Sequence, residues 1–231
     1  MQKKIVVLTG AGMSADSGVK TFRDAGGLWE GHDVMEVASP YGFASNPSLV
    51  LDFYNQRRRQ LLEVAPNPGH KMLAELERHF KVTIITQNID DLHERAGSSH
   101  ILHLHGELLK VRSTGDKTLI LDWKKDLNLG DTCSKGYQLR PHIVWFGEEV
   151  PLLSEAAQIT ATADILIIIG TSMQVYPAAS LLYYAKPQIP VYFIDPKPNI
   201  NESDFENLTI IEATAAKGVP TLVADLVRKE F

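Results

Sequence analysis

The sequence has little cysteine and no long hydrophobic run, and both shortages narrow what the protein can be. Its 231 residues include one cysteine, Cys133, so no intrachain disulfide can form, as is typical of proteins in a reducing compartment. The first apolar run, IVVL, is too short for the core of a signal peptide, and no segment reaches transmembrane length. We therefore expect a cytoplasmic protein with no membrane partner.

An excess of positive charge is missing too. The chain carries 23 Lys and Arg against 28 Asp and Glu, a net charge of −5, which argues against a nucleic-acid partner. Hydrophobic residues make up 44% and charged residues 22%, as in ordinary globular proteins. The length suits a single domain, with or without a smaller insertion, and no repeat or low-complexity linker divides it. We expect small molecules or local segments of other proteins as partners.

Short β-branched runs alternate with helical segments along most of the chain. The runs are nearly continuous in apolar residues, as in strands of a parallel sheet that are buried on both faces. Strands are predicted at 5–8, 82–85, 165–169, 191–194 and 208–211. Helices are predicted at 47–64 with Asn46 as N-cap, 69–80, 154–163 and 219–231. This alternation predicts an α/β protein with an open sheet.

Two stretches interrupt the alternation. Residues 31–79 are helical and rich in charge, and residues 108–138 carry the turn signals TGDK and NLGD around the β-like segment LILDW. We expect these stretches to form a small lobe. The larger part would then consist of residues 1–30, 80–107 and 139–231.

A glycine-rich loop, GAGMS, follows the first predicted strand. It is not a Walker loop, because such a loop ends in Gly-Lys-Ser/Thr and here Val19 separates Gly18 from Lys20. Nor is it the ordinary dinucleotide fingerprint, because Ala15 stands where the third glycine is needed. Gly10 and Gly12 still allow close approach of the backbone to a phosphate, and Ser14 adds a donor. A plain tight turn explains these residues equally well.

Polar residues also end two other predicted strands. TQNID, residues 86–90, follows VTII, and GTS, residues 170–172, follows ILIII. Amide, carboxylate and hydroxyl groups would thus gather at the carboxyl ends of parallel strands, where open α/β sheets bind ligands. A serine hydrolase is not expected, because a nucleophile elbow needs glycine two residues after the serine and Gln174 stands there.

The segment ILHLHGEL predicts a strand on which His103 and His105 face the same side. With His93 and Glu107 nearby in sequence, a metal site is one interpretation, although the spacing matches no common ligand motif. One exposed and one hydrogen-bonded histidine is the plainer interpretation, which the spacing alone favours. In a third, His105 is a general base that changes protonation near neutral pH.

Five segments together resemble the signature of a family. GAGMSADSGVKTFR, TQNIDDLHERAG, HLHGEL, VWFGE and GTSMQVYPAA, in this order and at these separations, are similar to the motifs of the sirtuins, the NAD-dependent protein lysine deacylases. The resemblance runs from Ile5 to about Val223. It implies one catalytic domain over residues 1–231, with a Rossmann-like large part and a small lobe. NAD and an acyl-lysine protein or peptide would enter the cleft between them.

The resemblance also implies roles for single residues. Asn88 and Asp90 would lie beside the nicotinamide, and His105 would act on a ribose hydroxyl while the acyl group passes to ADP-ribose. Asp195 stands where the family often has asparagine, and its carboxylate can accept from ribose hydroxyls equally well. The expected cofactor-binding residues are Gly10, Ala11, Gly12, Ser14, Phe22, Arg23, Gln87, Asn88, Ile89, Asp90, Gly170, Thr171, Ser172, Asp195 and Ala215.

The same resemblance places the acyl-lysine peptide. The peptide would pair as a strand with VWFGE and with the QVYP segment, so main-chain bonds would hold it and its flanking sequence would be read weakly. The residues expected to contact it are Val144, Phe146, Gly147, Glu148 and Val175.

The small lobe departs from the family's pattern. Many sirtuins hold a structural zinc ion with paired CxxC motifs, whereas this chain has Ser113 where a first cysteine is expected, and Cys133 alone. We therefore expect no zinc. The lobe would instead be stabilised by packing of Leu119, Leu121 and Trp123.

Tyr54 and Arg57 bear on the choice of acyl group. They lie three residues apart in a predicted helix, so the phenol and the guanidinium share one face and could hold a carboxylate together. The pair resembles the Tyr-x-x-Arg motif of the sirtuins that remove malonyl, succinyl or glutaryl groups. Alternatively, Tyr54 is a core residue and residues 57–59 are a solvated basic run. We favour the first interpretation, because a buried arginine needs an anionic partner.

These residues predict NAD-dependent removal of succinyl and malonyl groups, and of acetyl groups as well. A different class of function stays open. The domain could hydrolyse NAD or transfer ADP-ribose, or it could bind NAD as a sensor without catalysis. The sequence predicts no oligomeric state.

Overall fold

The computed structural model describes residues 2–20, 28–173, 175–200 and 205–230. Its largest sheet has six parallel strands in the order β11-β10-β9-β1-β4-β5. They are β1 (Lys4–Thr9), β4 (Lys81–Thr86), β5 (Ile101–His103), β9 (Ile165–Ile169), β10 (Val191–Ile194) and β11 (Leu208–Ile211). The five strands predicted from their apolar runs are confirmed, and β5 joins them at the edge.

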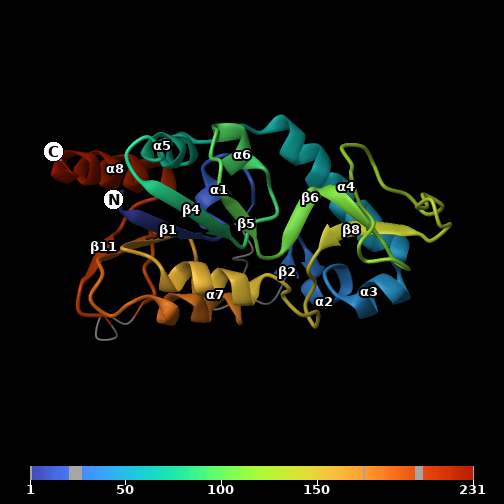
Figure 1. Cartoon of the computed structure of the whole chain (residues 1–231). Helices are drawn as coiled ribbons and strands as arrows, with labels where there is room; N and C mark the ends of the chain where they lie inside the picture. Colours follow the sequence, from blue (N-terminus) through green and yellow to red (C-terminus); the bar gives the residue numbers. More distant parts are fainter. Residues whose placement is uncertain (1, 21–27, 174, 201–204, 231) are drawn as a thin grey trace.

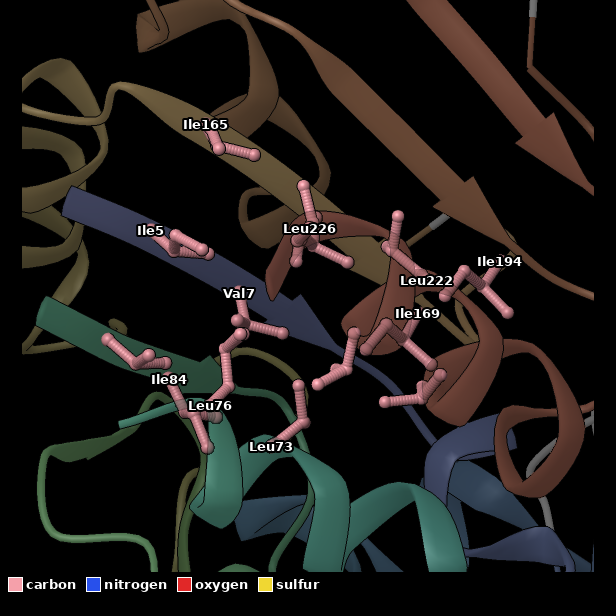
Figure 2. Packing of buried hydrophobic residues seen from close by; sticks show 14 of the residues in the cluster. Ile5, Val7, Leu73, Leu76, Ile84, Ile165, Ile169, Ile194, Leu222 and Leu226 are labelled. Carbon is pink, nitrogen blue, oxygen red and sulfur yellow. The ribbon is translucent and has the colours of Figure 1, made fainter. Parts of the chain in front are cut away.

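Helices cover both faces of this sheet, as the continuous apolar strands predict. Ile5 and Val7 of β1 lie in one buried cluster, and Val6 and Leu8 lie in another on the opposite face. The helices α5 (Pro68–Leu76) and α8 (Ala215–Glu230) cover the first face, and α7 (Leu153–Ala161) and the 3-10 helix η1 (Ala178–Tyr184) cover the second (Figure 1). Figure 2 shows Leu73 and Leu76 of α5 and Leu222 and Leu226 of α8 packed over the strands. Each such side chain contributes about 1.5–3 kcal/mol by leaving water.

A smaller antiparallel sheet lies at the other end of the molecule (Figure 1). Its strand order is β7-β6-β8, formed by β6 (Gly106–Ser113), β7 (Ile120–Asp122) and β8 (Leu139–Ile143). Side chains of α4 (Pro47–Glu63) pack with this sheet in two buried clusters. Short elements complete the lobe: β2 (Leu28–Trp29), β3 (His32–Asp33), α2 (Val34–Val37) and α3 (Pro40–Ser45). Two further short helices, α1 (Gly12–Ala15) and α6 (Leu92–Ala96), follow β1 and β4.

The contacts of α5 and β8 bear on where the small lobe begins and ends. Residues 68–76 were expected in the small lobe, but α5 packs with α8 on the parallel sheet. β8 was expected in the large part, but it pairs with β6. We therefore propose that the lobe ends before α5 and extends through β8.

The segment HLHGEL is not one strand, so this prediction was wrong. β5 ends at His103, and β6 begins at Gly106, whose φ of +81° turns the chain out of the parallel sheet. A side chain at Gly106 would also collide with the carbonyl oxygen of His142, 2.0 Å from an added Cβ. His103 and His105 therefore do not alternate on a common strand.

The helix ends follow local chemistry. Asn46 caps α4 as predicted, because its Oδ1 accepts from the backbone N–H of Leu49 at 3.1 Å. α5 is shorter than predicted, and α8 starts at Ala215 and includes Pro220. In the part of the chain that is described, no helix combines the apolar character and the length that crossing a bilayer requires.

Candidate active site

Three parallel strands end at a cavity of about 280 Å³ between the sheet and the small lobe. β1 leads to Gly10, Ala11 and Ser14, β4 leads to residues 87–90, and β9 leads to residues 170–172, all of which line it. β4 lies on one side of β1 and β9 on the other, so the cavity is at the point where the strand order reverses. Ligands of open α/β sheets bind at this switch point.

The glycines of the first loop allow it to pack directly on the loop after β9. The backbone N–H of Gly12 donates to the carbonyl of Gly170 at 2.8 Å. An added Cβ on Gly12 would lie 2.6 Å from Cα of Gly170, and one on Gly10 would lie 2.7 Å from Cβ of Thr171. The tight turn is therefore required by packing, and Gly10 also forms part of the cavity wall.

Ser14 links the side chains at the floor of the cavity. Its hydroxyl donates to Oδ2 of Asp90 at 2.8 Å and accepts from Nδ2 of Asn88 at 3.2 Å. Asn88 Nδ2 also donates to the carbonyl of Gly10 at 3.0 Å, so both amide hydrogens are used and its Oδ1 keeps the role of acceptor. Burial raises the pKa of the Asp90 carboxyl, although the hydrogen bonds from Ser14 and from the N–H of Leu92 act to lower it. The chain thus holds an amide and a carboxyl group in fixed positions.

His105 lies in the same cavity as a neutral base. Its Nδ1 is 3.0 Å from the carbonyl oxygen of Gln87, so Nδ1 carries the hydrogen and Nε2 keeps the lone pair. Burial lowers the pKa of His105, and the bond to Gln87 only partly opposes this. An unprotonated imidazole at neutral pH is suited to accept a proton.

His103 has a different environment. Its Nε2 lies 2.7 Å from Oε1 of Glu94, and its Nδ1 lies 3.2 Å from the carbonyl of Asn88. Burial lowers the pKa of His103, but the bond and charge of Glu94 outweigh burial and raise it overall. The plainer interpretation, one exposed and one hydrogen-bonded histidine, was wrong in part, because His103 and His105 are both hydrogen-bonded and neither is exposed. Among the described residues, no group of three or more His, Cys, Asp or Glu side chains could hold a metal ion.

Tyr54 and Arg57 line two adjoining cavities. Tyr54 is fully buried, lines the large cavity, and its hydroxyl oxygen accepts from Nε1 of Trp145 at 2.9 Å. Arg57 lines a neighbouring cavity of about 50 Å³, whose wall also includes Ile89 and Asp90 of the large one. Its Nη1 donates to the carbonyl of Phe53 at 2.6 Å, as the guanidinium lies over the Phe53 ring.

Arg57 is held near an internal anion. Its Nη2 is 3.7 Å from Oε2 of Glu30, which also accepts from Lys20 Nζ at 2.8 Å. Nε of Arg57 is buried and has no hydrogen-bond partner among the described residues. Burial lowers the pKa of Arg57, and the charge of Glu30 opposes this by raising it. The ordinary pKa of an arginine is so high that the guanidinium stays cationic.

The neighbouring arginines exclude a uniformly solvated basic run. The side chain of Arg59 is 57% exposed. Arg58 is buried, where its Nε donates to the carbonyl of Leu108 and its Nη1 to Oδ1 of Asn55. The helix therefore presents three successive arginines to three different environments.

The expected peptide-contact segments are turns and not strands. Val144 N–H donates to the carbonyl of His105, after which the chain turns, with Gly147 at φ +87°. Glu148 is engaged by Arg140 and Arg112, at 2.8 and 2.9 Å. Residues 175–177 also form a bend and turn, and Gln174 lies outside the described residues. All five expected contact residues still line the cavity: Val144, Phe146, Gly147, Glu148 and Val175.

Some expected cofactor residues do not reach the cavity. Over the described residues, its lining lacks Gly12, Asp195 and Ala215. Asp195 is buried at the end of β10, where its Oδ1 accepts from the N–H of Lys197, and Ala215 is buried at the start of α8. Phe22 and Arg23 lie outside the described residues. Their roles stay predictions.

The small-lobe core follows the expectation in part. Leu119 and Trp123 pack against a buried cluster that includes Cys133, but Leu121 is 39% exposed, so its expected packing role was wrong. All three residues of the short strand β7 are exposed. Cys133 Sγ donates to Oγ of Ser113 at 3.3 Å. The absence of zinc stays a prediction.

Several cavity residues were not predicted. Trp145 is the most consequential, since it sits inside VWFGE and contacts Tyr54 directly. The sequence signal for Trp145 was its position in VWFGE, whose other four residues were all expected to contact the peptide. The others that line the cavity are Val19, Lys20, Trp29, Ala38, Ile143, Val150, Tyr176 and Pro177.

Comparison with known families and sequences adds to this geometry. The profile of the Sir2 family matches residues 10–177. A protein of Helicobacter pylori strain J99 named NAD-dependent protein deacylase is 62% identical over 225 residues, 97% of this chain and 96% of the relative. A protein of the same name from Bacteroides thetaiotaomicron is 54% identical over 226 residues, 95% of this chain and 96% of its own length.

Solved structures agree in fold over almost the whole chain. A Sir2 homolog in complex with NAD is 37% identical, with a TM-score of 0.88 over 99% of this chain and 91% of the other. A Sir2 complex with a p53 peptide and NAD⁺ is 27% identical, with a TM-score of 0.82 over 98% and 95%.

Proposed function

Because the chain belongs to the Sir2 family, we propose that it is an NAD-dependent protein lysine deacylase that releases nicotinamide and passes the acyl group to ADP-ribose. The observation that carries this proposal is the composition of one cavity. His105, Asn88 and Asp90 line it from the parallel sheet, and Tyr54 lines it from the small lobe. The groups that would serve as the base, as the amide and carboxyl pair and in acyl recognition would therefore share one space. The names of the relatives support the same activity.

The residues present fit NAD. The cavity lies at the switch point of a parallel sheet, and two loops meet there too closely for any side chain at Gly10 or Gly12. Residues 10–14, 87–90 and 170–172 would hold the dinucleotide, with Asp90 and Asn88 beside its cationic ring. When bound, NAD supplies the ribose carbon that takes up the acyl oxygen.

His105 would act as the general base. The Gln87 carbonyl fixes its Nδ1–H, so Nε2 is the atom that takes the proton of a ribose hydroxyl. Burial keeps the imidazole neutral in the resting state. Ser14 would keep Asp90 and Asn88 in place through its two hydrogen bonds.

We propose further that acidic acyl groups, succinyl and malonyl, are preferred and that acetyl is also accepted. Tyr54 supplies a protonated phenol, and Arg57 supplies a guanidinium whose buried Nε lacks a partner among the described residues. Oε2 of Glu30 lies 3.7 Å from Nη2 of Arg57, in the position that we propose for a carboxylate of the substrate. An acidic acyl chain would therefore replace Glu30 as the partner of Arg57.

The small lobe would work without zinc, and the single buried cysteine is consistent with action in the cytoplasm. The metal content of the purified protein, measured by mass spectrometry, tests the first point. One equivalent of zinc per chain would overturn it.

The reaction class is tested by nicotinamide release from NAD with and without an acyl-lysine peptide. We expect release to require the peptide and to match the deacylated product one to one. Release at the same rate without the peptide would favour the alternative, an NAD hydrolase. His105→Ala should lower the steady-state rate of peptide-dependent release about 10²–10⁴-fold, and Arg59→Met, at an exposed position, should leave it unchanged.

A further inference from the structure

The bond between Trp145 and Tyr54 fixes the direction of a donor. Both side chains line the large cavity, and their exposed fractions are 2% and 0%. An indole N–H only donates, so the Tyr54 oxygen must be the acceptor in the 2.9 Å bond from Trp145 Nε1. The hydrogen of the Tyr54 hydroxyl therefore points elsewhere.

Within the described parts of the chain, that hydrogen has no acceptor. Among the described residues, the bond from Trp145 is the one hydrogen bond of the Tyr54 side chain. Burial raises the pKa of Tyr54, so the phenol keeps its hydrogen at neutral pH. A buried donor without a partner costs about 1–3 kcal/mol, so an acceptor that enters the cavity is favoured.

The indole itself is locked in place. The Arg140 guanidinium lies 3.3 Å from the centre of its ring, and the ring of Phe43 lies 5.3 Å away. The backbone N–H of Trp145 donates to Oε2 of Glu148 at 2.8 Å, and Glu148 is bound in turn by Arg140 and Arg112. If the Trp145 side chain rotated away from Tyr54, it would lose its contacts with Arg140 and Phe43, while the cluster of Arg140, Arg112 and Glu148 fixes the backbone at Trp145.

We propose that Trp145 is a positioning residue for acyl specificity: its indole N–H holds the Tyr54 oxygen so that the hydroxyl donates to a carboxylate at the end of the acyl chain. The inference rests on the proposed preference for acidic acyl groups. An acetyl group carries no oxygen beyond its amide carbonyl, so loss of this donor direction affects acetyl-lysine far less.

Trp145→Phe tests the inference, because it keeps an aromatic ring beside Arg140 and removes the N–H together with the five-membered ring that carries it. We expect kcat/KM for a succinyl-lysine peptide to fall about tenfold, mainly through KM, with the acetyl-lysine value within twofold of the wild type. Trp123→Phe is the matched control, since Trp123 Nε1 donates to the Asp126 carbonyl away from the cavity, and it should change neither value.

A double-mutant cycle with Tyr54→Phe separates positioning from general support. If Trp145 acts through the Tyr54 hydroxyl, Trp145→Phe in the Tyr54→Phe background should cost nothing further. Equal losses for both peptides, an unchanged succinyl to acetyl ratio, or additive effects in the cycle would each overturn the inference. A wild-type enzyme that does not turn over succinyl-lysine would overturn the acyl preference, and the inference with it.

Discussion

Replacing Arg57 by methionine should remove the preference for acidic acyl groups. The change keeps an unbranched apolar side chain on α4 over Phe53 and removes the guanidinium, which lies 3.7 Å from Glu30. A hydrogen bond to a charged group contributes about 1.5–3 kcal/mol net, which corresponds to about 10- to 150-fold. A substrate carboxylate must first displace Glu30, so we expect the lower part of this range, about 10- to 50-fold, in kcat/KM for succinyl-lysine.

The assay for Arg57→Met follows peptide turnover by mass spectrometry at saturating NAD. The acetyl-lysine value should stay within about twofold, since an acetyl group makes no contact with the guanidinium. Arg59→Met is the control on the same helix, because the Arg59 side chain is 57% exposed and its ion pairs with Asp52 and Asp126 are solvated. Equal losses with both peptides would refute the reasoning and make Arg57 a structural residue.

Three other predictions concern the base, the internal anion and acid stability. His105→Ala should lower turnover about 10²–10⁴-fold with NAD affinity retained by calorimetry. Because burial lowers the pKa of His105, the wild-type rate should fall only at acid pH, where Nε2 becomes protonated; a pH-independent rate would contradict this. Glu30→Gln should lower KM for succinyl-lysine two- to fivefold, as Arg57 loses a competing carboxylate, and an unchanged KM would contradict this. Burial lowers the pKa of His70 to about 4, so the unfolded chain alone binds this proton between pH 6.5 and 4, and the free energy of unfolding should fall by about 3 kcal/mol over that range. Urea unfolding of the wild type and His70→Gln checks this, and equal acid sensitivity of the two would count against it.

The parallel sheet could be predicted because its strands are buried on both faces. Ile165–Ile169 is a continuous apolar run, and every residue in it is buried. Asn46 likewise predicted the start of α4, because its side chain satisfies a backbone N–H within three residues. Such features depend on residues that are close together in the sequence, so they can be predicted from it.

Features that depend on distant contacts were missed. The chain turns at Gly106, where the His142 carbonyl of β8 leaves no room for a side chain. β8 follows more than thirty residues later, so this contact cannot be read from HLHGEL, whose alternation predicted one strand. α8 begins at Ala215, before its predicted start at Val219, and both residues pack on the sheet. The lobe border proposed before α5 could not be derived from the sequence for the same reason, since the sequence of α5 does not say which face it covers.

The site was predictable where residues follow strands. Strand ends placed Gly10, residues 87–90 and residues 170–172 at one edge, and the cavity contains them. Trp145 was not predicted, because its importance lies in a bond to Tyr54, 91 residues away in the chain. Glu30 was missed similarly, since its pairing with Arg57 depends on how the lobe closes around α4.

The most direct test of the account is the turnover of two peptides of identical sequence, one carrying succinyl-lysine and one acetyl-lysine, measured with and without NAD. The account predicts turnover of both only with NAD, and a higher kcat/KM for succinyl-lysine. NAD consumption with neither peptide deacylated would contradict the proposed activity. NAD-dependent turnover of acetyl-lysine alone would contradict the roles given to Tyr54 and Arg57.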